Sequence, residues 1–188
     1  LLTAPVFAGC AAAGAVGAVA GIANSALEMT GLKKPDTGPI KVDLTLEAGN
    51  NLNASAGQPM AMVTKIYYLQ DIEGFLRAPL STLLDAGTPG TPTPGILAVR
   101  DVTLTPGQRY VNVEQVPREA VAIGVAGMFF NPAQGRWKQA FQLDTARRTG
   151  ITLGVHACAL TVVKGEIVRL PGAPDYDPSR LAGVQCPR

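Results

Sequence analysis

Three cysteines and a single histidine are the first candidates for covalent or metal chemistry in this 188-residue chain. The histidine, His156, lies in the apolar stretch GVHAC, and the spacing of the cysteines matches no known zinc pattern. The chain also lacks a phosphate-binding glycine loop and the Gly-x-Ser-x-Gly elbow of hydrolases. We therefore predict no catalytic residue, no metal site and no enzyme, and we interpret His156 as a core or sheet-face residue.

The first cysteine, Cys10, follows an apolar segment and two small residues, in the order Phe7-Ala8-Gly9-Cys10. This pattern is similar to a bacterial lipobox, although Phe7 replaces the usual leucine. Residues 1–9 are then the end of a signal peptide that is removed. Cys10 would carry diacylglycerol on its thiol and an acyl chain on its new amine, and we predict no other cofactor. The alternative is a buried free cysteine in an Ala-rich helix.

A lipidated Cys10 would leave the protein in an oxidising compartment with two further cysteines, Cys158 and Cys186. By lipoprotein sorting rules, Ala11 carries no inner-membrane retention signal, which favours the periplasmic face of the outer membrane. In the periplasm two cysteines can form a disulfide. Closing a loop of this length would stabilise the fold by about 3 to 4 kcal/mol. Two unpaired thiols remain the alternative.

Composition excludes some classes of function. The formal net charge is only +2, and lysines and arginines are scattered rather than clustered, so nucleic-acid binding is not predicted. The longest apolar run, residues 11–23, is shorter than the roughly 18 to 20 residues of a membrane-spanning helix. Residues 11–32 show helical spacing of apolar residues, and we predict an Ala-rich helix there, followed by a linker to residue 38.

The rest of the chain has the pattern of a β protein. Residues 40–48 alternate between apolar and polar side chains, as a half-buried strand does. A helical insert, broken near Pro79, is predicted at about residues 72–86, and a Pro-rich tail at 171–188. Seven or eight short strands predict a two-sheet β-sandwich over residues 39–170. The predicted strands are 40–48, 60–70, 96–107, 108–116, 120–130, 137–143 and 151–163.

These features occur in an order that resembles the TssJ family of type VI secretion lipoproteins. The lipobox comes first, then a helix ending in ALEMTGLKKP, then the stretch NLNASAGQPMAMVTKIYYLQD. Lys138 follows Trp137 where the family usually has arginine, and Pro59 stands near a proline that the family has just before the second strand. The residues that match the family's motifs are Asn51, Asn53, Gly57, Tyr67 or Tyr68, Leu69, Phe75, Leu83, Leu84, Pro106, Gly107 and Trp137.

The resemblance implies a transthyretin-like sandwich on an outer-membrane lipoprotein. Its partner would be the periplasmic domain of TssM, within a TssJ–TssL–TssM complex. The loop between the first two strands would bind TssM, and replacing residues 51–53 together should weaken binding without lowering stability. The alternative is an ordinary Asn/Gly turn. The predicted binding residues are Asn50, Asn51, Leu52, Asn53, Ala54, Ser55 and Gln58.

Two other functions compete with this non-catalytic scaffold. One is a periplasmic carrier whose sandwich holds a small apolar ligand or a sugar, and the other is a hydrolase with an unrecognised site. A carrier needs an apolar pocket between its sheets, whereas a scaffold is expected to have a filled core.

Overall fold

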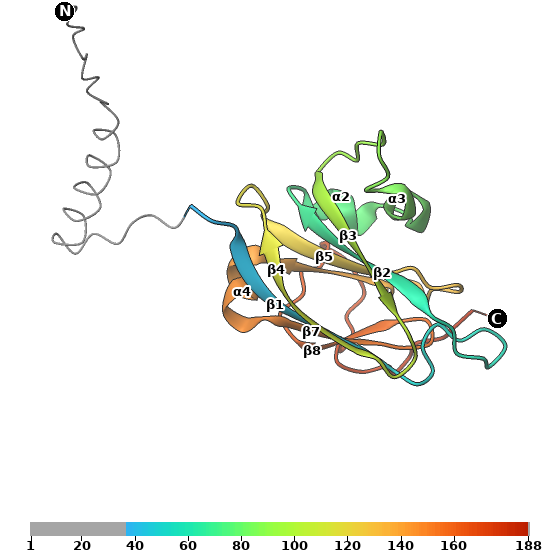
Figure 1. Cartoon of the computed structure of the whole chain (residues 1–188). Coiled ribbons are helices and arrows are strands. Elements are labelled where there is room, and N and C mark those ends of the chain that lie inside the picture. Colours follow the sequence, from blue (N-terminus) through green and yellow to red (C-terminus); the bar gives the residue numbers. More distant parts are fainter. Residues whose placement is uncertain (1–36, 188) are drawn as a thin grey trace, which may run out of the picture. The chain divides into compact units, whose positions relative to one another are not determined.

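Two four-stranded sheets face each other in the computed structural model, which describes residues 37–187 (Figure 1). One sheet has the order β4-β1-β7-β8 and the other β3-β2-β5-β6, so the predicted β-sandwich is confirmed. The predicted Ala-rich helix and Cys10 lie outside the described residues. The strands are β1 (Ile40–Ala48), β2 (Met62–Leu69), β3 (Ile96–Leu104), β4 (Arg109–Val116), β5 (Ala122–Gly127), β6 (Lys138–Gln142), β7 (Ile151–Val155) and β8 (Leu160–Lys164).

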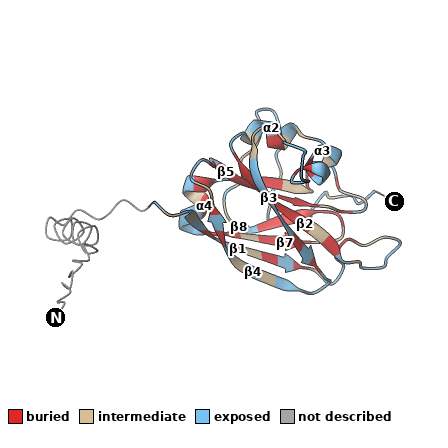
Figure 2. Cartoon of the chain, turned by 45° about the horizontal axis from the view of Figure 1, so that its top comes forward, coloured by how far each residue is buried: buried red, intermediate tan, exposed pale blue. Residues whose placement is uncertain are grey.

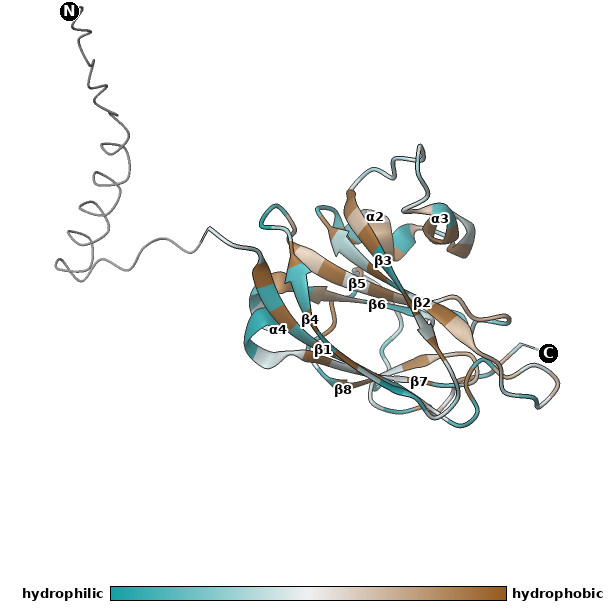
Figure 3. Ribbon diagram, viewed as in Figure 1, coloured by the Kyte–Doolittle hydropathy of each residue, from teal (hydrophilic) through white to brown (hydrophobic). Residues whose placement is uncertain are grey.

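Strand β1 shows how the alternating sequence builds the core. Val42, Leu44 and Leu46 are fully buried between the sheets, whereas Asp43 and Glu47 on the opposite face are exposed. Hydrophobic and hydrophilic residues alternate along β1 in Figure 3. β1 pairs with β4 in the antiparallel and with β7 in the parallel direction, so it is a central strand of its sheet. Aliphatic side chains from both sheets fill the space between them.

The central strands β2 and β5 of the second sheet are buried on both faces, which explains the near-continuous apolar run of β5. The outer face of this sheet is covered by α2 (Ile72–Arg77) and α3 (Leu80–Asp85) (Figure 2). The Tyr67 hydroxyl donates a hydrogen bond to the Leu83 carbonyl, at 2.7 Å, and its ring lies 5.2 Å from that of Phe75. A Cβ on Gly124 would lie 2.7 Å from the Phe75 ring, so glycine is required there.

The region after β6 differs from the sequence prediction. Residues 151–163 are not one long strand but the hairpin of β7 and β8, which reverses at residues 156–159. An unbroken apolar run cannot reveal such a turn, because both strands are buried. A helix that we did not predict, α4 (Leu143–Thr149), precedes β7 and ends at Gly150, whose φ is +72°.

The C-terminal tail, which in the structure comprises residues 165–187 after β8, covers two strand edges. The Val168 N–H donates to the carbonyl of Ala140 in β6, at 2.8 Å, and the Val162 N–H of β8 donates to the carbonyl of Pro178, also at 2.8 Å. β6 and β8 are the outermost strands at this side of their sheets. The tail therefore satisfies backbone groups that would otherwise form open edges.

Candidate partner-binding site

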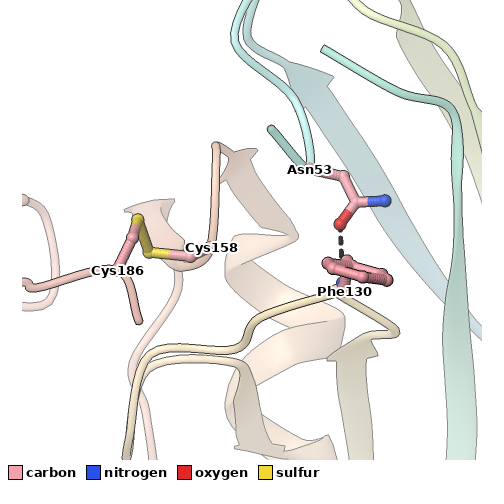
Figure 4. Close-up of a disulfide and its surroundings, with 4 residues drawn as sticks. All are labelled: Asn53, Phe130, Cys158 and Cys186. Atoms are coloured by element: carbon pink, nitrogen blue, oxygen red, sulfur yellow. Dashed lines mark hydrogen bonds between the residues drawn. A yellow bond between two sulfur atoms is a disulfide. The ribbon is translucent and has the colours of Figure 1, made fainter. Parts of the chain in front are cut away.

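The loop between β1 and β2 has a fixed base. Asn53 is 6% exposed, and its side-chain oxygen accepts a 2.7 Å hydrogen bond from the Phe130 N–H (Figure 4). Its amide group donates to the Ala61 carbonyl, at 3.4 Å, and its own backbone N–H donates to the His156 carbonyl, at 3.0 Å. Asn53 also has a φ of +46°, a conformation that asparagine tolerates better than most residues. Asn53 thus joins three loops at one end of the sandwich, two through its side chain and the β7–β8 turn through its backbone N–H.

The tip of the same loop is exposed. Ser55 and Gln58 exchange two backbone hydrogen bonds, at 2.9 and 3.0 Å, around Ala56 and Gly57. Both central residues have positive φ, +48° and +79°, as in a type I′ turn. Such a conformation costs a residue like Ala56 about 1 kcal/mol or more. The tip is therefore a tight, preformed turn whose shape is set before any partner arrives.

The predicted binding residues divide into two groups. Asn50, Asn51 and Gln58 are exposed, and Ala54 and Ser55 are half-buried, so these five are available at the surface. Leu52, by contrast, is fully buried in the core, and Asn53 is buried at the loop base.

The expectation that residues 51–53 can be replaced together without loss of stability is therefore wrong. Removing Leu52 would leave a cavity in the core, and removing the Asn53 side chain would leave the partly buried N–H of Phe130 without its partner. The Asn-x-Asn pattern could not separate these roles, because asparagine serves equally in turns, in buried hydrogen bonds and in binding surfaces.

Phe130 is a candidate binding residue that the sequence analysis missed. It follows β5, and 66% of its surface is exposed, although its backbone is bonded to Asn53. Phe129, next to it, is 3% exposed and belongs to the core. In the apolar run GMFF both phenylalanines were expected in one strand. Side chains along an extended chain point alternately to opposite faces. Applied beyond Gly127, this rule places Phe129 and Phe130 on opposite faces, so it could have predicted that one of them is exposed.

The cysteine pair and the histidine lie close to this end of the sandwich. Cys158 and Cys186 are joined by a disulfide, which links the turn between β7 and β8 to the tail rather than to a long strand (Figure 4). The Ala133 N–H donates to the Cys158 carbonyl, at 2.8 Å, so the β5–β6 loop is tied to the same turn. His156 lies in this turn, 2.8 Å from the Thr161 hydroxyl, and burial lowers the pKa of its imidazole. A neutral His156 with one hydrogen bond fits a structural role.

Residues 37–187 hold no group of three or more His, Cys, Asp or Glu side chains that could bind a metal ion. Within the same range, no helix has the length and apolar character needed to cross a membrane. What this part of the chain does offer is a filled sandwich with a preformed turn and an exposed aromatic side chain beside it. This arrangement is typical of a protein-binding module.

The chain belongs to the family of type VI secretion lipoproteins. The model of this family, described as "Type VI secretion lipoprotein, VasD, EvfM, TssJ", matches residues 40–158, which include both sheets up to the β7–β8 turn. The resemblance predicted from the sequence is thereby confirmed. No curated protein matches the chain significantly.

Several solved structures share the fold. A chain in a structure titled "T6SS protein TssM C-terminal domain (869-1107) from EAEC" is 28% identical, with a TM-score of 0.57, and the match covers 65% of the present chain and 97% of that one. A chain of a "Type VI membrane complex" is 29% identical, with a TM-score of 0.59 and coverages of 66% and 98%. TssJ1 of Pseudomonas aeruginosa, at 22% identity, has a TM-score of 0.58 and coverages of 68% and 98%, and it supports the fold.

Proposed function

We propose that this protein is an outer-membrane lipoprotein that anchors a type VI secretion membrane complex. Its sandwich would bind the periplasmic C-terminal part of TssM, within a complex that also contains TssL. The contact surface, which we call the tip surface, consists of residues 54–58 and Phe130. The observation that carries the proposal is the exposed Phe130, whose backbone is bonded to Asn53 at the base of the loop that ends in the preformed turn.

The physical case rests on preorganisation. Binding costs less when the contact residues are already ordered, and the Asn53 hydrogen bonds hold both loops in place. A phenylalanine ring that is 66% exposed gains by transfer into an apolar pocket, and aromatic residues dominate the binding energy of many interfaces. The tight Ser55–Gln58 turn adds polar backbone and side-chain groups for hydrogen bonds at the rim.

The comparisons support TssM as the partner. The chain matched in the structure titled for TssM is shorter than the present chain, because 65% of the present chain covers 97% of it. The TssM fragment of that title runs from residue 869 to 1107 and is longer than the present chain. We infer that the matched chain is a companion of TssM in that structure. A second match, in a type VI membrane complex, agrees with a role within an assembly.

The carrier alternative has less support. Its ligand would need room between the two sheets, and buried side chains such as Leu44, Ile66, Leu104 and Phe141 fill that space. For the hydrolase alternative, the described residues offer one histidine, which is bonded to Thr161 in a turn. A non-catalytic scaffold is the function that agrees best with the family and with the filled core.

Affinity for TssM tests the tip surface. We expect the full chain, carrying Cys10→Ser to avoid lipid, to bind the TssM C-terminal domain saturably in calorimetry. Phe130→Ser should weaken this binding at least tenfold, which corresponds to about 1.4 kcal/mol, because the ring's apolar contact is lost. Gln58→Arg should weaken it as well by placing a bulky charge at the turn.

The matched control is Val121→Ser. Val121 is 50% exposed but precedes β5, at the opposite end of that strand from Phe130. Its replacement should leave the affinity within twofold. If the Phe130 and Val121 variants bound TssM with equal affinity, Phe130 would not be part of the interface. If the protein with an unchanged tip surface did not bind TssM at all, the proposal of TssM as partner would be wrong.

Membrane anchoring is tested separately at Cys10. The wild-type protein should have the mass of a chain that begins at Cys10 plus a diacylglyceryl group on the thiol and one acyl chain on the amine, and it should fractionate with outer membranes. Cys10→Ser should release a folded protein into the periplasm, because the thiol that accepts the lipid is gone. An unlipidated wild-type protein, or a Cys10→Ser protein that still fractionates with membranes, would contradict the anchor.

A further inference from the structure

A second candidate site lies on another part of the surface. A cavity of about 240 Å³ opens between α2, the start of β6 and the C-terminal tail. Three of its side chains are cationic, those of Arg136, Lys138 and Arg169. The match to the family model ends at residue 158, so the cavity residues that the tail contributes lie outside the matched region. The apolar part of the lining consists of Leu76, Val168, Leu170, Ala173 and Pro174.

Among residues 37–187, two of the cations form no salt bridge with a carboxylate. Arg136 is only 7% exposed, and its guanidinium donates to the Arg180 carbonyl while its Nε has no hydrogen-bond partner in the part of the chain that the structure describes. The Lys138 ammonium donates to the carbonyls of Phe75 and Ala78, at 2.7 and 2.6 Å, and burial lowers its pKa to about 8. Placing a charge in a buried position without a counter-ion is costly.

The nearby carboxylates are engaged elsewhere. Asp175 pairs with Arg169, at 2.6 Å, and Asp177 pairs with Arg180, at 3.1 Å, while also accepting hydrogen bonds from Ser179. Within residues 37–187, neither the buried Arg136 nor the half-buried Lys138 forms a salt bridge with these carboxylates, although Asp177, whose pKa is lowered first by its hydrogen bonds with Ser179, also interacts electrostatically with Arg136.

Tyr176 fixes the position of the two arginines. The guanidinium carbons of Arg136 and Arg169 lie 4.2 and 4.5 Å from the centre of its ring, which is a cation–π geometry. Two like charges held beside one ring repel each other, and an anion beside them would relieve that repulsion. Planar guanidinium groups fit carboxylates well, because they can donate two parallel hydrogen bonds.

We propose that this cavity binds the carboxylate of a small ligand with an apolar body, of the kind found at the C-terminus of a peptide. The carboxylate would be neutralised by Arg136 and Lys138, and the apolar group would contact Leu76, Val168 and Leu170. An inorganic anion would satisfy the charges but would leave the apolar lining in contact with water. The size of the cavity suits one or two residues rather than a long chain.

The fluorescence of Trp137, the only tryptophan in the sequence, can report on this cavity because its ring lies 4.8 Å from the Lys138 ammonium. The full chain is titrated at neutral pH with N-acetyl-alanyl-alanine and with the C-terminal amide of the same dipeptide. We expect a saturable change with the acid and at least tenfold weaker binding of the amide. Arg136→Gln should weaken binding of the acid at least tenfold.

Because Arg136→Gln could unfold the tail, Ala173→Asp provides a second variant at an exposed residue of the cavity. Its carboxylate should compete with the ligand and weaken binding at least tenfold. Ala98→Asp, on the exposed face of β3 at the other edge of the sheet, is the control and should have no effect. No saturable change, equal binding of acid and amide, inorganic phosphate binding as tightly as the acid, or no effect of Ala173→Asp would overturn the proposal.

Discussion

At the residue scale, Asn53 is central to the structure of the binding end. Its side chain bonds the backbone of the β5–β6 loop and the end of its own loop, and its N–H bonds the β7–β8 turn. A buried amide with these partners stabilises the fold, whereas the same site without it would hold an unpaired N–H of Phe130.

We predict that Asn53→Ala lowers the free energy of unfolding by about 1 to 3 kcal/mol, through the lost hydrogen bonds and the positive φ that alanine disfavours. Urea denaturation measures this change. Gln58→Ala, at the exposed tip, is the control and should change stability by less than about 0.5 kcal/mol. If both variants were equally stable, Asn53 would not be the residue that holds the loops.

The sequence identified the right loop but not the roles of its residues. Asn51 and Asn53 have the same side chain and lie two positions apart, yet one is exposed and the other buried. Leu52 between them enters the core. This division depends on contacts with His156 and Phe130, which are far away in the sequence, and local patterns hold no information about such contacts.

At the scale of elements, the tail closes the side of the sandwich that β6 and β8 form. It bonds to β6 and β8 at their outer edges, and the disulfide fixes its end to the β7–β8 turn. Sequence reasoning proposed the cysteine pair, but a Pro-rich segment without periodicity does not reveal which edge it covers.

Replacing Cys158 and Cys186 together by alanine should lower the free energy of unfolding by about 3 to 4 kcal/mol, because the unfolded chain is then no longer constrained by the closed loop. Thermal and urea denaturation of the double variant measure the effect. The wild-type protein in a reducing agent is the comparison, because its disulfide is also broken. Unchanged stability in both would mean that the tail's backbone hydrogen bonds hold it without the disulfide.

The strands were predictable to different degrees. β1 alternates strictly between apolar and polar residues because only one of its faces is buried, and its bounds follow from the sequence. β7 and β8 were merged into one strand because the turn at residues 156–159 contains mostly small or apolar residues. α4 was missed because its seven residues are too few to establish a helical period.

At the scale of the whole molecule, the sandwich presents a rigid platform with its candidate contacts at one end. The loops at that end are joined by Asn53, and the β5–β6 loop and tail are both tied to the β7–β8 turn. A platform whose loops are fixed in this way suits the anchoring role that we propose. The family match and the filled core agree with this use.

The most direct test of the central claim is amide hydrogen exchange of the full chain with and without the TssM C-terminal domain. We expect TssM to slow exchange in residues 54–60 and 129–131, while the exposed residues around Val121 and the edge strands β3 and β4 exchange as before. Slower exchange confined to β3 and β4, with residues 54–60 and 129–131 unchanged, would contradict the central claim.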